Sequence, residues 1–141
     1  MTTEPIGRRG GCLCGAVRYT LTGPPLRAGI CHCLDCRKAS GSHFTPFGVW
    51  PASAFECAGE MKVFAKRSFC PACGSRIAWL RDGEAEIMLG SLDDAPTGIV
   101  PEYELWIGRR EDWMDPLPWA EQFDQDRPES SAEGQPCGKP G

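Results

Sequence analysis

Seven of the nine cysteines fall into three short groups along the chain. In chain order the groups are CLC at 12–14, CHCLDC at 31–36 and CPAC at 70–73. Zinc prefers thiolate ligands about 2.3 Å away in a tetrahedron, and the tight turn of a C-x-x-C pair directs two sulfurs to one point. In a C-x-C pair on an extended strand, both sulfurs lie on the same side. These spacings indicate zinc coordination.

The seven cysteines divide naturally into a set of four and a set of three. A closed structural zinc site takes four ligands, and the outer groups supply Cys12, Cys14, Cys70 and Cys73. The middle group supplies Cys31, Cys33 and Cys36. Three protein ligands leave a fourth position open, which is typical of a catalytic zinc, so we expect two zinc ions per chain. A partition in which the middle group shares ligands with the C-x-x-C pair stays compatible with the spacing, as does a purely structural role for all seven.

Four further residues could take part in chemistry. On an extended backbone His32 points away from its neighbouring cysteines, so we do not expect it to be a fourth ligand. Cys57 has no partner in the sequence, and we predict a buried free thiol. Cys137 lies in a polar tail and is interpreted as a bystander. His43 is a lone loop histidine, a type more often structural than catalytic, and we assign no general acid or base.

Short strands must position the cysteines. Apolar and polar residues alternate over 16–21, which is the period of a half-buried strand. Aromatic and β-branched residues favour further strands at 45–50, 61–65 and 103–107. A hairpin is predicted from 75–80 and 84–89, with Asp82 and Gly83 in a type I′ turn that needs positive φ at both positions. Helical patterns are short, at 34–39 and 110–114.

Length and composition favour one soluble domain. The chain has 141 residues, enough for a hydrophobic core, and no apolar run long enough to span a membrane. We predict a flexible N-terminus at 1–8, the zinc-binding domain at 9–125, and a disordered tail at 126–141, where apolar residues are scarce. The N-terminal MTTEPIGRRGG has no secretory pattern. We therefore expect a cytoplasmic protein, whose reducing surroundings favour metal ligands over disulfides.

The three cysteine motifs, taken in order, resemble those of the GFA family, which is named for glutathione-dependent formaldehyde-activating enzyme and includes centromere protein V. The matching segments read GGCLCGAVRY, CHCLDCRKASGSHF and KRSFCPACGSRIAW, and the resemblance extends over about residues 9–120. It implies a mainly β fold of short, bent antiparallel sheets, shared with methionine sulfoxide reductase B. It also implies the division into a structural four-cysteine zinc and a functional three-cysteine zinc.

The resemblance further implies an activity. The founding reaction condenses formaldehyde with glutathione to S-hydroxymethylglutathione, so the chain is expected to be a zinc-dependent carbon–sulfur lyase acting on a thiol–aldehyde adduct. The alternative is a non-catalytic zinc module that binds a protein partner or a small thiol. A zinc ribbon on nucleic acid is a third hypothesis, which the scattered basic residues and a pI of about 5.2 disfavour. The sequence assigns no oligomeric state.

Charge is unevenly distributed along the chain. Residues 1–81 carry a balance of +7 and residues 82–141 a balance of −11, for a net charge of −4. The two parts can neutralise each other, or the basic part can attract an anionic ligand. Four cations flank the cysteine groups: Arg37, Lys38, Lys66 and Arg67. They are candidates to hold the carboxylates of a thiol such as glutathione, or they are ordinary surface charges.

Overall fold

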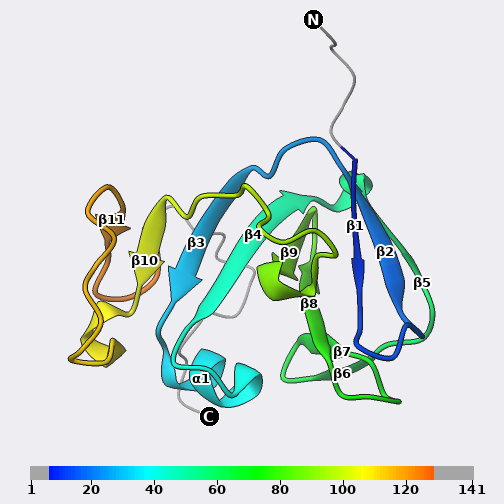
Figure 1. The fold of residues 1–141 in the computed structure, drawn as a ribbon, viewed down its shortest axis with the longest axis horizontal. Coiled ribbons are helices and arrows are strands. Elements are labelled where there is room, and N and C mark those ends of the chain that lie inside the picture. The colour runs from blue at the N-terminus through cyan, green and yellow to red at the C-terminus, as the bar shows by residue number, and fades with distance from the viewer. Residues whose placement is uncertain (1–6, 129–141) are drawn as a thin grey trace, which may run out of the picture. The chain divides into compact units, whose positions relative to one another are not determined.

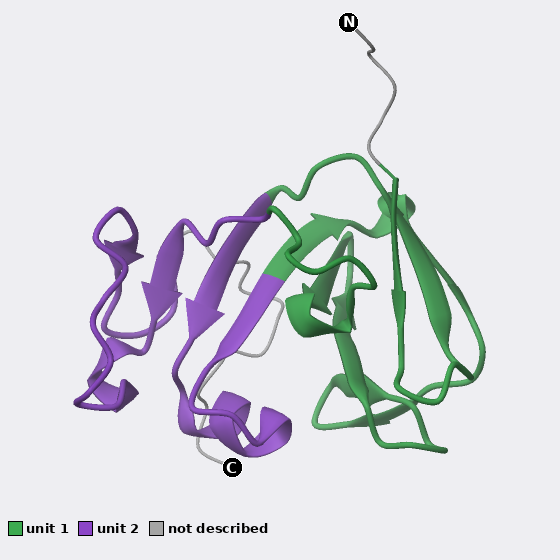
Figure 2. Cartoon of the chain, in the orientation of Figure 1, with its two compact units in different colours: residues 1–26, 48–98 green, residues 27–47, 99–141 purple. Residues whose placement is uncertain are grey.

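The computed structural model describes residues 7–128, which form two compact units (Figure 2). Unit 1 contains residues up to 26 together with 48–98, and unit 2 contains 27–47 together with the residues from 99 onward. The prediction of a mainly β fold is confirmed. In the described part of the chain a single α-helix, α1 (Leu34–Ser40), accompanies the strands.

Unit 1 holds two groups of antiparallel strands. One is β1-β2-β5, with bounds Gly7–Gly11, Arg18–Thr22 and Phe55–Ala58. The other is β9-β8-β7-β6, with bounds Glu84–Met88, Arg76–Arg81, Arg67–Phe69 and Lys62–Phe64. A short 3₁₀ turn at Ala52–Ala54 directly precedes β5, and another at Leu89–Ser91 directly follows β9. In β2 the side chains of Tyr19 and Leu21 are buried while their neighbours are exposed, as the sequence alternation predicts.

Unit 2 contains two parallel strand pairings. Its strands are β3 (Arg27–Cys31), β10 (Tyr103–Leu105) and β11 (Glu121–Gln122), and Figure 1 shows β10 between the other two. Both pairings of β10 are parallel, whereas the expectation was antiparallel sheets. The seventy-odd residues between β3 and β10 allow the crossover that a parallel pair requires. Strand β4 (Thr45–Pro51) begins in unit 2 and ends in unit 1.

A close approach fixes the spacing of β3 and β10. Gly29 pairs with Tyr103, and a Cβ at Gly29 would lie 2.8 Å from Cε2 of the tyrosine ring. The ring of Tyr103 also packs edge-on against Phe47 and Phe123, with centroids 5.9 and 6.2 Å away. Glycine is therefore required where β3 passes the ring. This position lies two residues before Cys31, the last residue of β3.

The predicted elements agree with the structure except at one turn and one helix. The strand predicted at 16–21 is β2, those at 45–50, 61–65 and 103–107 are β4, β6 and β10, the hairpin is β8–β9, and the helix at 34–39 is α1. The helix predicted at 110–114 is wrong. A 3₁₀ turn at Ile107–Arg109 stands before it, and Arg110 then takes an extended conformation, which leaves one isolated turn bond from Met114 to Glu111.

The type I′ turn also lies elsewhere. Only Gly83 takes a positive φ in the β8–β9 turn, so the prediction for Asp82 and Gly83 is wrong. Between β6 and β7, however, Ala65 and Lys66 have φ of 50° and 68°. Those two residues close a two-residue hairpin loop with the backbone signs that a type I′ turn demands, without the usual Asn or Gly.

Ordered contacts extend slightly beyond both ends of the predicted zinc-binding domain. Strand β1 begins at Gly7, inside the segment expected to be flexible, because Gly7 and Arg8 pair with β2 and the Arg8 guanidinium donates to the Thr97 carbonyl. Asp126, expected in the disordered tail, accepts a hydrogen bond from the Trp106 indole. Residues 129–141 of that tail lie outside the described residues. Within the described residues, no helix is long and apolar enough to cross a membrane.

Candidate metal centres

The four predicted structural ligands meet in unit 1. This four-cysteine cluster consists of Cys12, Cys14, Cys70 and Cys73. One pair follows β1 and the other joins β7 to β8. Each pair is followed by a glycine with positive φ, Gly15 at 87° and Gly74 at 82°, which lets the chain turn back after presenting its sulfurs.

The spacing of the sulfurs in the four-cysteine cluster fits a zinc tetrahedron. The Cys14 Sγ lies 3.6 Å from the Cys12 Sγ and 3.8 Å from the Cys70 Sγ. All four Sγ atoms lie within 4.8 Å of one another. A tetrahedron with bonds of about 2.3 Å has edges of about 3.8 Å, so one zinc ion would bind all four thiolates with little movement.

Hydrogen bonds prepare these sulfurs for negative charge. The backbone N–H of Val17 donates to the Cys12 Sγ at 3.2 Å, and that of Ala72 donates to the Cys70 Sγ at 3.3 Å. The Ser75 hydroxyl lies 3.2 Å from the Cys73 Sγ. Such donors favour the thiolate over the thiol. The cluster is thus arranged to hold deprotonated sulfur, which is the form that binds zinc.

The thiols of the cluster ionise unequally before a metal binds. Hydrogen bonds from the side chain and backbone of Ser75 lower the pKa of Cys73 to about 5. A backbone hydrogen bond from Ala16 lowers the pKa of Cys14, but the neighbouring thiol of Cys12 and burial outweigh it and raise that pKa to about 11. Sulfurs this close cannot all carry charge alone, and coordination to a cation would deprotonate the rest.

The other three predicted ligands meet in unit 2. This three-cysteine cluster consists of Cys31, Cys33 and Cys36, whose Sγ atoms lie within 4.8 Å of one another. Cys31 ends β3, Cys33 caps α1, and Cys36 lies in the first turn of that helix. The three residues are 1%, 0% and 5% exposed. Within the described residues no fourth His, Cys, Asp or Glu joins this cluster, so this part of the chain offers three buried ligands.

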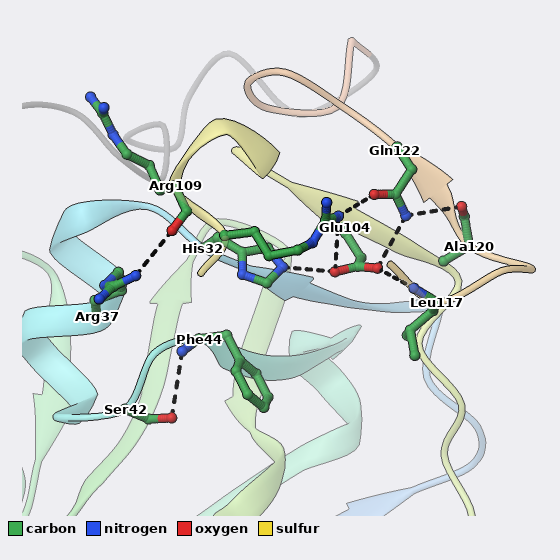
Figure 3. Close-up of polar contacts among 10 residues, drawn as sticks. His32, Arg37, Ser42, Phe44, Glu104, Arg109, Leu117, Ala120 and Gln122 are labelled. Carbon is green, nitrogen blue, oxygen red and sulfur yellow. Dashed lines mark hydrogen bonds and ion pairs between the residues drawn. The ribbon is translucent and has the colours of Figure 1, made fainter. Parts of the chain in front are cut away.

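His32 lies between two members of the three-cysteine cluster, yet its side chain makes a different contact. The Nε2 atom lies 2.7 Å from Glu104 Oε1, and both residues are buried (Figure 3). The Nδ1 atom is buried and has no hydrogen-bond partner in the described structure. The Nε2 side of the ring therefore faces Glu104 on β10.

Glu104 is a buried carboxylate that collects four donors, and the sequence analysis missed it. Its Oε1 atom faces His32 and, at 3.4 Å, Arg110, while its Oε2 atom accepts from the backbone N–H of Leu117 at 2.8 Å and from Gln122 Nε2 at 3.1 Å. Burial raises the pKa of Glu104, but the bond from His32 and the other donors outweigh it and lower the pKa to about 2. The carboxylate is therefore charged at neutral pH.

The predicted cations have mixed outcomes. Arg37 is already paired. Its guanidinium lies 2.6 Å from Glu111 Oε2. It also donates to the Arg109 carbonyl at 3.0 Å (Figure 3). Lys38, next to it on α1, is exposed. In unit 1, Lys66 is exposed in the β6–β7 turn, and Arg67 packs over the Trp79 ring. Of the two cations on α1, Arg37 is therefore paired and Lys38 is exposed to solvent.

The remaining candidate residues from the sequence are Cys57, His43 and Cys137. Cys57 is exposed, so the prediction of a buried thiol is wrong; it lies on β5, where three of the four residues are exposed. His43 packs its ring edge-on against Trp113, with centroids 5.4 Å apart. Cys137 lies outside the described residues.

Comparison with known proteins gives a family and a fold. Residues 7–109 match the model of the family described as glutathione-dependent formaldehyde-activating enzyme. Among solved structures, a Rhodobacter sphaeroides protein is similar, with a TM-score of 0.50 and 22% sequence identity. The similarity covers 66% of this chain and 97% of that protein, and it supports the fold. The matched range includes all seven clustered cysteines.

Proposed function

This chain belongs to the family of glutathione-dependent formaldehyde-activating enzymes, and from that premise we propose that it is a zinc-dependent carbon–sulfur lyase. Its substrate is a thiol–aldehyde adduct of the S-hydroxymethylglutathione type. The reaction takes place at the three-cysteine cluster, while the four-cysteine cluster holds a structural zinc. The chain carries two zinc ions and acts in the cytoplasm, where its thiols stay reduced.

The difference in ligand number between the clusters carries this proposal. The four-cysteine cluster completes a tetrahedron from the protein alone, and a fourth protein ligand leaves no position for a substrate. The three-cysteine cluster offers three sulfurs, and His32, which stands nearest in sequence, directs its Nε2 to Glu104 instead. A zinc ion bound there would keep one position for a ligand that the protein does not supply.

The reaction is a simple addition that needs no oxidant. The sulfur of the thiol forms a bond to the aldehyde carbon, the π pair of the carbonyl moves to oxygen, and the thiol proton ends on that oxygen. Zinc supplies a place where a thiol binds as its thiolate, the nucleophilic form, at neutral pH. Since a free thiol with a pKa near 8.5 is only a few per cent thiolate at pH 7, this increases the reactive fraction.

The chain's own residues hold and orient the reactants. The three cysteines are buried, so the ligand position they frame is shielded from bulk water. Their rigidity comes from β3, from the cap of α1, and from Thr45, whose hydroxyl donates to the Cys36 carbonyl at 3.1 Å. Positioning of two reactants is a large source of rate enhancement.

The test compares two serine variants, one at Cys36 in the three-cysteine cluster and one at Cys57 outside both clusters. The rate of exchange of ¹³C-formaldehyde into S-hydroxymethylglutathione is measured by NMR for the zinc-loaded protein. We expect acceleration by the wild type, loss of it in Cys36→Ser, and retention in Cys57→Ser, because Cys57 lies on β5 outside both clusters. Zinc content is expected to be two per chain in the wild type and in Cys57→Ser, and one in Cys36→Ser.

Two results would contradict the proposal. Equal exchange rates in Cys36→Ser and Cys57→Ser, with both folded, would remove the three-cysteine cluster from the reaction. Saturable binding of glutathione by the wild type, without any acceleration of exchange, would favour the non-catalytic module that binds a small thiol.

A further inference from the structure

Strand β10 contacts the segment that carries the three-cysteine cluster, and one of these contacts is the buried pair of His32 and Glu104. Strand β10 runs parallel to β3, with Glu104 opposite Ile30 and Leu105 opposite Cys31. The next residue of the cluster segment, His32, donates its backbone N–H to the Leu105 carbonyl at 3.0 Å. Its side chain meets Glu104 through Nε2. Both the backbone and the side chain of His32 are thus held by β10.

The contact to Glu104 is the one polar contact that fixes the His32 ring. Its Nδ1 atom has no hydrogen-bond partner within residues 7–128, and the ring is completely buried. The ring also lies near that of Phe44, with the two centroids 6.1 Å apart and the ring planes tilted by 48°. An aromatic contact at that distance limits the position of the ring but sets its rotation only weakly. The hydrogen bond to Glu104 therefore decides which way the ring faces.

Glu104 is itself held in place from the far side. Its second oxygen accepts from the Leu117 backbone and from Gln122, and Arg110 lies against the first oxygen while also donating to Gln122 (Figure 3). Arg110, Leu117 and Gln122 all come after residue 109, where the family match ends. Membership of the family therefore does not by itself imply this arrangement.

We propose that Glu104 is a positioning residue for the three-cysteine metal site. By holding the ring of His32, it fixes the backbone between Cys31 and Cys33 and so the direction in which their sulfurs point. Side chains behind the metal ligands orient them, and loss of such a side chain commonly costs about 10- to 100-fold in metal affinity. The inference rests on the metal site of the proposed function, but concerns metal binding rather than turnover.

The near-isosteric variant Glu104→Gln tests this without leaving a cavity. The two oxygens of Glu104 face donors on both sides, Arg110 beside His32 on one and Leu117 and Gln122 on the other. An amide supplies one oxygen and one NH₂ group, so either orientation turns a donor toward another donor. The matched control is Asp93→Asn, which makes the same chemical change at the exposed ion pair with Arg18 in unit 1.

The readout is the metal itself. The protein is loaded with one equivalent of zinc to fill the four-cysteine cluster, and cobalt(II) is then titrated into the three-cysteine cluster and followed by its d–d and sulfur-to-cobalt absorption bands. We expect Glu104→Gln to bind cobalt at least 10-fold more weakly, with shifted d–d bands, and Asp93→Asn to match the wild type. Glutathione exchange is measured in parallel.

The outcomes separate the positioning role from a merely structural one. A folded Glu104→Gln with lower thermal stability but unchanged cobalt affinity and bands overturns the inference. Should Glu104→Gln not fold, His32→Asn removes the same hydrogen bond from the other side, and unchanged cobalt binding in that variant overturns it as well. A wild type that fails to accelerate exchange while Glu104→Gln still weakens cobalt binding contradicts the proposed function and leaves the positioning role in place.

Discussion

The Sγ of Cys33 accepts a hydrogen bond from the backbone N–H of Cys36 at 3.2 Å, so one ligand of the three-cysteine cluster also caps the helix that carries another. Cys33 has the extended conformation of an N-cap residue, with φ of −63° and ψ of 158°. At the other end, Gly41 ends α1 with a φ of 74° and donates to the Arg37 carbonyl at 2.8 Å. The same sulfur therefore serves helix α1 and the metal site.

This double role predicts that Cys33→Ser and Cys33→Ala differ in metal-free stability but both lose metal binding at the three-cysteine cluster. A serine hydroxyl can cap a helix as sulfur does here, whereas alanine cannot, and loss of a cap costs about 0.5–2 kcal/mol. We expect metal-free Cys33→Ala to be about 1 kcal/mol less stable than metal-free Cys33→Ser by urea unfolding. Both variants should lose metal at the three-cysteine cluster. Equal stability of the two would mean that the cap contributes nothing.

Ser75 connects the two halves of the four-cysteine cluster. Its hydroxyl accepts from the Leu13 backbone N–H at 3.0 Å, which leaves its proton for the Cys73 sulfur 3.2 Å away. Ser75→Ala removes both bonds, and a net hydrogen bond is worth about 1 kcal/mol. We expect zinc to leave this cluster for a chelator roughly 5-fold faster. Ser42→Ala, which removes a hydroxyl in unit 2, serves as the control and should not change that rate.

The close approach of β3 to Tyr103 makes Gly29 sensitive to any side chain. A Cβ there would lie 2.8 Å from the ring, which packs between two other aromatic residues and cannot easily move. We expect Gly29→Ala to destabilise the protein by about 1–3 kcal/mol in thermal or urea unfolding. The control is Gly108→Ala, where a Cβ meets nothing within 4 Å. If both variants unfold like the wild type, β3 and β10 are not packed as closely as described.

The lowered pKa of Glu104 predicts how the free energy of unfolding depends on pH. Its pKa is lowered from an ordinary 4.5 to about 2 in the folded protein. A depressed carboxylate pKa stabilises the native state above the unfolded pKa, and that contribution disappears as the pH falls from about 4.5 to about 2. At neutral pH the contribution is on the order of 3 kcal/mol.

The comparison with Glu104→Gln isolates this effect. In metal-free protein, we expect the difference in unfolding free energy between wild type and Glu104→Gln to be constant at neutral pH and to shrink below about pH 4.5. Urea unfolding at a series of pH values, with a chelator present, measures it. A difference that does not change with pH would show that the Glu104 carboxylate has no unusual pKa.

Local pattern was enough to predict six of the eleven strands of the described chain, its α-helix and the grouping of the cysteines. The spacing of C-x-C and C-x-x-C pairs is a property of neighbouring residues, and so is the period of β2, which places Tyr19 and Leu21 inside. The helix after Cys33 was likewise predictable, because a cap and a short run of helix formers lie together in sequence. For the same reason, the division of seven cysteines into four and three agrees with the clusters in the structure.

Contacts between distant segments were not predictable in this way. Glu104 faces His32 because β10 pairs in parallel with β3, and nothing local in either strand specifies that partner. One signal was present: a charged residue between Tyr103 and Leu105 in a short strand, which in a parallel ladder covered on both faces has to be buried and paired. Cys57 was misjudged for a related reason, since its exposure depends on how β5 lies at the edge of its ladder.

The central claim is that the three-cysteine cluster binds a zinc ion whose fourth ligand comes from outside the protein. X-ray absorption at the zinc edge measures the average number of sulfur ligands per zinc directly. With four sulfurs on one ion and three on the other, the zinc-loaded protein should give about 3.5 sulfurs per zinc, rising to about 4 when glutathione is added. An average of four sulfurs before glutathione, or no increase after it, would contradict the account.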